Sequence, residues 1–137
     1  MTGELNNPDD LLARFLFFQK YFKQTQNRAT PEAFMPPPKD LQLSVSLITD
    51  LLADAIWDLG KGVLAQHPQP QLYGRADINV AAVHGQKLKA FRDDDPPRHV
   101  NVVGWPSYSE GKDLIKSMAQ ELARASSLTL LSTPLSK

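Results

Sequence analysis

The stretch LQLSVSLI, residues 41–48, decides the fold class because apolar and polar residues alternate along it. Such alternation predicts a β-strand that buries one face. The residues after it change to three- and four-residue spacing, which predicts an amphipathic helix with the apolar positions Leu52, Ala55, Ile56, Leu59 and Val63. We expect Thr49 or Asp50 to cap this helix, and Gly60 and Gly62 to end or fray it.

Prolines mark the boundaries of the other predicted elements. They cluster at residues 31–38, 68–70 and 96–106, and each cluster predicts a break because proline fixes φ and donates no backbone hydrogen bond. Before the first cluster, the segment NPDD at 7–10 predicts a capped turn. Residues 11–22 fit either a helical stripe or a short aromatic strand, and we favour the strand.

The later segments alternate between strand and helix patterns. We expect strands at residues 71–78, 88–91 and 99–103, a helical turn at 80–84 and an edge strand at 128–131. A last amphipathic helix follows Ser107, which has capping-box spacing to Glu110.

The order of these elements predicts an α+β fold. We expect one mainly antiparallel sheet of about four to six strands, with two main amphipathic helices packed on one face. The whole chain, residues 1–137, is predicted to form a single domain. Its ordered core is expected at about residues 9–131, with flexible ends at 1–7 and 132–137.

The composition excludes several classes of protein. With 15 basic and 15 acidic side chains the net charge is zero, which argues against a strongly basic nucleic-acid-binding body. The absence of cysteine excludes disulfides, a thiolate nucleophile and cysteine-bound metals. The N-terminus has no signal-peptide pattern and no apolar run reaches the roughly 20 residues of a membrane span, so we expect a soluble, cytoplasmic protein without a membrane partner.

No familiar catalytic motif is present, and the strongest candidate site combines two predicted strands. Arg75 and Asp77 share one face of the first strand, and His99 and Asn101 share one face of the second. In a shared pocket, Arg75 would clamp an anion, His99 would act as acid or base, and Asp77 would orient the imidazole. The alternative is an ordinary strand face, with an Arg75–Asp77 ion pair and His99 packed beside Trp105.

Two weaker patterns concern metals and nucleic acid. The run DDD at 93–95 near His99 offers metal ligands, but we favour a solvated turn and expect neither a metal nor a cofactor. Basic and aromatic residues are interleaved at 14–28, as in proteins that bind single-stranded nucleic acid. We favour core rings and solubilising cations there, so nucleic acid is the less favoured partner.

Two further features suit contacts with another protein. A row of acidic residues on the predicted helix is either a solvated face or a docking face for a basic partner: Asp50, Asp54 and Asp58. The segment AFMPPP at 33–38 is stiff and extended, and it either packs on its own domain or offers a binding ridge. The candidate binding residues are Phe34, Met35, Pro36 and Trp105.

Several segments together resemble an uncharacterised group of small bacterial proteins. They include AFMPPP at 33–38, LSV at 43–45, GRAD at 74–77 and PPRHVNVVGWP at 96–106, and the similarity spans about residues 12–126. The resemblance implies a single bacterial domain and brings with it no activity, cofactor or partner.

The function favoured by these observations is a protein-interaction module within a larger system, whose partner could be the product of a neighbouring gene. The alternative is a protein that binds nucleotides or RNA, or cleaves phosphoesters, through Arg75, Asp77 and His99. The enzyme interpretation requires Arg75 and His99 to open into one pocket, within about 10 Å of each other.

Overall fold

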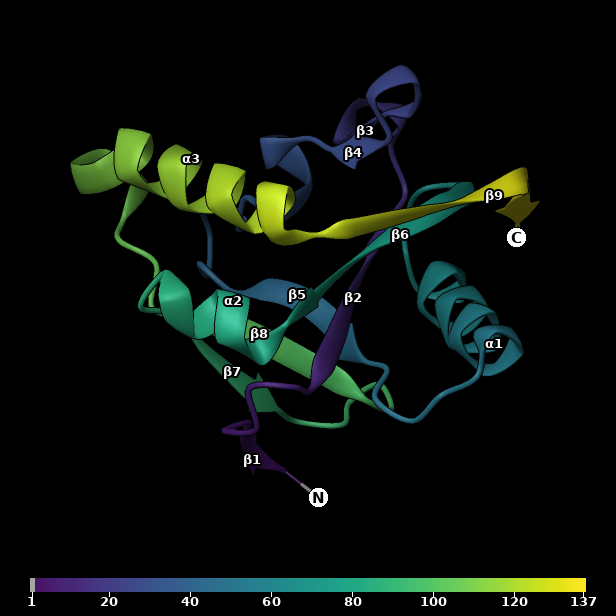
Figure 1. Cartoon of the computed structure of the whole chain (residues 1–137), viewed down its shortest axis with the longest axis horizontal. Helices are drawn as coiled ribbons and strands as arrows, with labels where there is room; N and C mark the ends of the chain where they lie inside the picture. The colour runs from purple at the N-terminus through teal and green to yellow at the C-terminus, as the bar shows by residue number, and fades with distance from the viewer. Residues whose placement is uncertain (1) are drawn as a thin grey trace.

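Seven strands form one antiparallel sheet in the order β1-β7-β8-β5-β2-β6-β9 (Figure 1). The structure is a computed structural model and describes residues 2–137. The strands are β1 (Gly3–Glu4), β2 (Leu11–Leu16), β5 (Leu43–Leu47), β6 (Gln71–Asn79), β7 (Lys89–Arg92), β8 (His99–Val103) and β9 (Ser127–Ser136). The predicted α+β class and antiparallel sheet are confirmed, and β2 confirms the strand that we favoured within residues 11–22.

The sheet has more strands than the four to six that we predicted, because strands form at both ends of the chain. In β1, Gly3 pairs with Arg92, although two residues are too few to show a period in the sequence. At the other edge, β9 continues past the predicted edge strand, and Ser136 pairs with Gln71. Both segments that we predicted to be flexible therefore contain paired strands.

Gly74 lets β9 lie close against β6. A Cβ atom at this position would lie 2.5 Å from the carbonyl oxygen of Thr129 and 2.9 Å from a methyl carbon of Leu130. Any larger residue would push the two strands apart, so glycine is required by close backbone approach.

The two main helices, α1 (Ala53–Ala65) and α3 (Tyr108–Ala125), pack on opposite faces of β2. Leu12 is buried in the core that contains α3, whereas its neighbour Ala13 is buried in the core that contains α1. Our prediction that both helices lie on one face is therefore wrong. The cause is that β2 is apolar at successive positions, so both of its faces need a cover. The short helix α2 (Val80–Gly85) confirms the predicted helical turn.

Neither predicted helix cap forms. Asp50 has a left-handed φ of 66° and lies in the loop before α1. The Thr49 hydroxyl accepts the backbone N–H of Leu11 at 2.8 Å, so it ties β2 to this loop instead of capping the helix. Before α3, the Ser107 hydroxyl contacts the Ser109 hydroxyl at 3.3 Å and caps no backbone amide.

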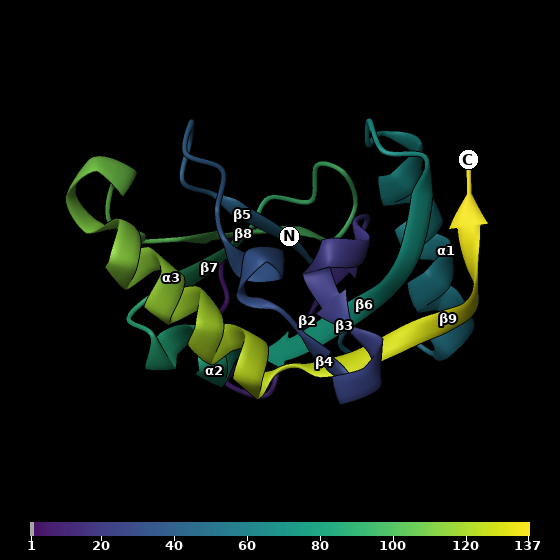
Figure 2. The same ribbon diagram turned by 90° about the horizontal axis from the view of Figure 1, so that it is seen from above.

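A small hairpin extends the molecule beside α3. It consists of β3 (Phe22–Lys23) and β4 (Arg28–Ala29), and a 3-10 helix at Pro31–Phe34 follows it. Figures 1 and 2 place the hairpin beside the C-terminal end of α3. Residues of the hairpin and of α3 line one hollow between them. No helix within residues 2–137 is both long and apolar enough to cross a bilayer.

Gly60 lies inside α1, which continues through Gly62 to Ala65, so our prediction that these glycines end the helix is wrong. A Cβ atom on Gly60 would lie 2.8 Å from the ring of Phe15 and 3.0 Å from a methyl carbon of Leu72. The missing side chain therefore allows α1 to approach the sheet closely.

We predict that Gly60→Ala lowers the free energy of unfolding by about 1–3 kcal/mol, because the added methyl group overpacks this contact. The matched control is Gly62→Ala, in the same helix, where a Cβ atom would meet nothing within 4 Å. That variant should gain up to about 1 kcal/mol from helix propensity. Chemical denaturation measures both values, and equal gains in the two variants would contradict the close approach at Gly60.

Candidate functional site

Side chains from three adjacent strand positions form a row on the face of the sheet that α1 partly covers. Ser46 of β5 lies directly opposite His99 of β8. On the other side of His99, Asp93 follows the end of β7 and donates its backbone N–H to the His99 carbonyl at 3.1 Å. The row therefore reads Asp93, His99, Ser46 across the sheet.

Asp93 fixes the orientation of the His99 ring. One carboxylate oxygen of Asp93 lies 2.7 Å from His99 Nδ1, and the other accepts the side-chain amide of Asn101 at 2.9 Å. Our prediction that Asp77 orients the imidazole is therefore wrong, because Asp93 occupies Nδ1. Asn101 does share a face with His99, and it steadies the carboxylate.

Hydrogen bonds also lower the pKa of Asp93. Its slight burial alone would raise the pKa, but the Asp95 amide, His99 and Asn101 all stabilise the ionised carboxylate and prevail. Asp93 is thus held as an anion beside the imidazole. This favours the tautomer of His99 in which Nδ1 carries the proton and Nε2 is the acceptor.

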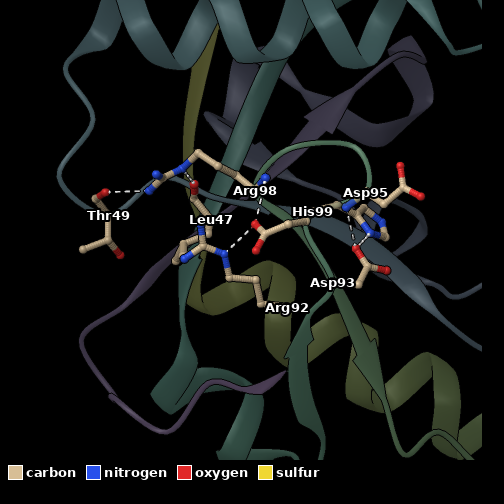
Figure 3. A network of polar contacts seen from close by, with 8 residues as sticks. Leu47, Thr49, Arg92, Asp93, Asp95, Arg98 and His99 are labelled. Atoms are coloured by element: carbon tan, nitrogen blue, oxygen red, sulfur yellow. Dashed lines mark hydrogen bonds and ion pairs between the residues drawn. The ribbon is translucent and has the colours of Figure 1, made fainter. Parts of the chain in front are cut away.

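The loop that carries Asp93 is anchored to the neighbouring strand (Figure 3). Arg98 donates through Nε to the carbonyl of Leu47 at 2.5 Å and through Nη2 to the carbonyl of Thr49 at 2.9 Å. At the start of the loop, Arg92 Nε forms an ion pair with Asp94 Oδ1 at 2.6 Å. The Arg98 hydrogen bonds join the loop to the end of β5, and the Arg92–Asp94 pair stabilises the loop locally, so the loop has few ways to move relative to His99.

A pocket of about 200 Å³ opens beside His99, between the sheet and the C-terminal end of α1. Its apolar walls include Ala13, Phe15, Phe17 and Val63, and its polar lining residues are Arg14, Ser44, Ser46, Gln66, His67 and His99. The pocket is thus a mainly apolar hollow with a few polar groups, which is the usual form of a small-molecule site.

His67 is a pocket residue that sequence reasoning missed. Its ring stacks on Phe17 with centroids 4.0 Å apart, and its Nδ1 accepts the backbone N–H of Gln69 at 3.1 Å. Since Nδ1 is an acceptor, the proton of the neutral ring is on Nε2. Burial lowers the pKa of His67, with smaller contributions from the charges of Arg14 and Lys137, and this favours the neutral form.

Arg75 and Asp77 lie on the same face as His99 but outside its pocket. Their strand, β6, is separated from β8 by β2 and β5. Three strand spacings, about 14 Å, therefore separate Asp77 from His99. Arg75 binds Asp77 at 3.1 Å, and its guanidinium lies over the ring of Trp57 in α1, 4.7 Å from the centroid.

The Arg75–Asp77 pair is largely buried, with side chains 12% and 16% exposed. Arg75 Nη1 and Asp77 Oδ1 are buried without a hydrogen-bond partner in the described part of the chain. Burial raises the pKa of Asp77 despite the opposing effect of Arg75. The stability that this group contributes is therefore greatest below the ordinary carboxyl pKa and decreases as pH rises through its folded-state pKa.

The predicted binding ridge packs largely on its own domain. Phe34 is fully buried, Pro36 is buried and accepts the Tyr108 hydroxyl at 2.5 Å, and Trp105 is 6% exposed. The Trp105 indole N–H donates to the carbonyl of Val102 in β8 at 3.0 Å, and its ring belongs to the α3 core rather than to the surroundings of His99. Of the four candidate residues, Met35 is the half-exposed one.

Met35 opens into a second hollow, which we call the basic groove. It has a volume of about 380 Å³ and lies between α3 and the β3–β4 hairpin with its 3-10 helix. Four cationic side chains and one acidic side chain line it: Lys23, Arg28, Lys116, Arg124 and Glu32. Glu32 is already paired with Lys20 at 3.7 Å, and Arg124 lies 3.6 Å from Glu121. The groove thus has a net positive charge in a neutral protein.

Neither a metal site nor a similarity to a known protein identifies a function. Among residues 2–137, no group of three or more His, Asp and Glu side chains is placed to hold a metal ion. Comparisons with protein-family models, with curated proteins and with solved structures found no match. The geometry of the two hollows must therefore carry the functional argument.

We predict a large coupling between Arg75 and Asp77. Arg75→Met or Asp77→Leu alone should lower the free energy of unfolding by about 3 kcal/mol, because each leaves its buried partner unpaired. The double variant should lie within about 1 kcal/mol of the wild type, since apolar groups can replace a buried pair. Urea denaturation of the wild type, the two single variants and the double variant measures the four free energies of unfolding. If the losses of the single variants simply add in the double variant, the buried ion pair is contradicted.

Proposed function

We propose that this protein is a protein-interaction module that binds an acidic segment of a partner protein in the basic groove. The observation that carries the proposal is the convergence of four cations from separate elements onto one hollow. Lys23 and Arg28 come from the hairpin, and Lys116 and Arg124 come from α3. Because the chain as a whole is neutral, this local excess distinguishes the groove from the rest of the surface.

The lining of the groove suits a peptide. Met35, Ala29 and Ala123 supply apolar contacts between the cations. A segment with carboxylates and a few aliphatic side chains would therefore find both charge and apolar complements. Carboxylate contacts of this kind steer association and fix orientation, and salt weakens them.

Nucleic acid fits the groove less well. No aromatic ring lines it, whereas single-stranded nucleic acid is held by stacking of bases on exposed rings. The rings of the nearby basic and aromatic segment already have aromatic partners: the centroids of Phe18 and Tyr21 are 4.9 Å apart, and Phe22 lies 6.0 Å from Tyr73 of β6. The phosphoester-cleaving alternative also lacks support, because Arg75 and Asp77 are not in the pocket of His99.

We predict that Lys116→Glu with Arg124→Glu weakens binding of an acidic peptide at least tenfold. The probe is a fluorescein-labelled peptide of eight glutamates and two leucines, and fluorescence anisotropy measures its affinity. The physical reason is that the double variant replaces attraction with repulsion on the α3 wall of the groove. Raising the salt concentration should weaken binding to the wild type and have less effect on the variant.

The matched control is Lys61→Glu with Lys112→Glu, which changes the net charge equally at exposed positions outside the groove. It should keep the wild-type affinity. Equal loss in both double variants would show a nonspecific charge effect and overturn the groove as the site. Tighter binding of a ten-nucleotide uridine oligomer than of the peptide would favour the nucleic-acid alternative instead.

A further inference from the structure

We propose that the pocket beside His99 is a second, independent site that hydrolyses small acyl esters. In this site Ser46 is the nucleophile, His99 is the general base, and Asp93 is the positioning residue that orients His99. The proposal does not rest on the basic groove, which lies against α3 on the other side of the sheet.

The strand register brings Ser46 and His99 together. The Leu47 amide donates to the Arg98 carbonyl at 2.9 Å, so the next pair along, Ser46 and His99, is a non-hydrogen-bonded pair. Side chains of such pairs approach most closely, with Cβ atoms about 4.5–5.5 Å apart. Both residues also line the same pocket.

The Asp93 contact occupies Nδ1 of His99 and leaves Nε2 available to act on Ser46. Asp93 lies at the end of β7, on one flank of β8, and it engages Nδ1 of the ring. Ser46 is on β5, on the opposite flank of β8. Because Asp93 engages Nδ1, Nε2 is the ring nitrogen left for a group in the pocket, and Ser46 lines that pocket. An acid, a base and a hydroxyl thus follow one another across three strands, which is the order that a hydrolytic triad requires.

Ser46 is free to serve this role. It is the one buried polar residue within the described chain, at 5% exposure, and its hydroxyl makes no hydrogen bond with another described residue. On the neighbouring strand β2, Ala13 pairs with Ser46, and its small side chain leaves room above the hydroxyl. A buried polar side chain without a fixed partner is uncommon in a core position.

The proposed hydrolysis needs only pocket side chains and water. Ser46 Oγ attacks the carbonyl carbon of the ester while His99 Nε2 takes the hydroxyl proton. The C–O bond to the alcohol then breaks, and His99 returns the proton to the leaving alcohol. A water molecule, activated by His99 in the same way, hydrolyses the acyl group on Ser46. His67 lines the pocket and its Nδ1 is already an acceptor, so we assign its Nε2–H as the donor to the developing oxyanion.

The pocket size sets the substrate class. A volume of about 200 Å³ is smaller than the roughly 300–1,000 Å³ of pockets for drug-sized ligands. The largely apolar walls suit a short acyl chain. Esters of small acids therefore fit the site best.

The test measures hydrolysis of p-nitrophenyl acetate together with covalent labelling by a fluorophosphonate probe. We expect one label per wild-type molecule, located on Ser46 by mass spectrometry, and a loss of at least 100-fold in hydrolysis and all labelling in Ser46→Ala. The control is Ser107→Ala, a serine before α3 that lies outside the pocket, and this variant should retain both hydrolysis and labelling. Wild-type rates in Ser46→Ala, or labelling of another residue, would overturn the proposal.

Cysteine substitution provides a second measurement that does not depend on turnover. The chain contains no cysteine, so Ser46→Cys and Ser44→Cys each carry a single thiol. Beside His99, the thiol of Ser46→Cys should ionise at lower pH than that of Ser44→Cys. The pH dependence of iodoacetamide alkylation reports this difference, and identical midpoints would overturn the Ser46–His99 pairing.

The role of Asp93 is tested with Asp93→Asn. This variant should lower hydrolysis at least tenfold and shift the pH profile, because the amide favours the other tautomer of His99. In the wild type, the bridging proton on His99 Nδ1 should give a downfield proton resonance that is lost in the variant. If the variant has a lower free energy of unfolding but keeps the wild-type pH profile of hydrolysis, Asp93 acts only on stability.

Discussion

The two-sided burial of β2 is the constraint on which the rest of the structure depends. Leu12 and Leu16 face the α3 core, and Ala13 and Phe15 face the α1 core, so one strand needs a helix on each side. Because Gly60 has no side chain, α1 lies close against Phe15 on one of these faces. The part of that face beyond α1, on β5 and β8, remains accessible at the pocket of His99.

Much of the fold followed from local patterns. The alternation at residues 41–48 and the helical spacing after it correspond to β5 and α1, and the proline clusters separate real elements. The helix caps and the ends of the sheet did not follow, because they depend on partners far away in the sequence. Thr49 looks like a cap, but its hydroxyl serves Leu11, and β9 is held by a glycine on β6 that permits close approach.

The candidate sites were harder to predict because they depend on register. The two-residue period correctly placed His99 with Asn101 and Arg75 with Asp77, yet only the strand order shows that two strands lie between these pairs. Asp93 was discounted as part of a solvated turn, and His67 has no local pattern around it. The basic groove combines a hairpin with a helix almost a hundred residues later, so charge counts along the sequence gave no indication of it.

The strand order also has a kinetic consequence. Of the neighbouring pairs in the sheet, β7 with β8 is the one joined by a short loop, whereas β2 must find β5 and β6 across long stretches of chain. Closing such loops costs entropy before any contact compensates for it, so chains of this topology fold in milliseconds to seconds rather than microseconds. During that interval β2 exposes apolar side chains on both faces, which makes the unpaired strand the segment most prone to aggregation while the chain folds.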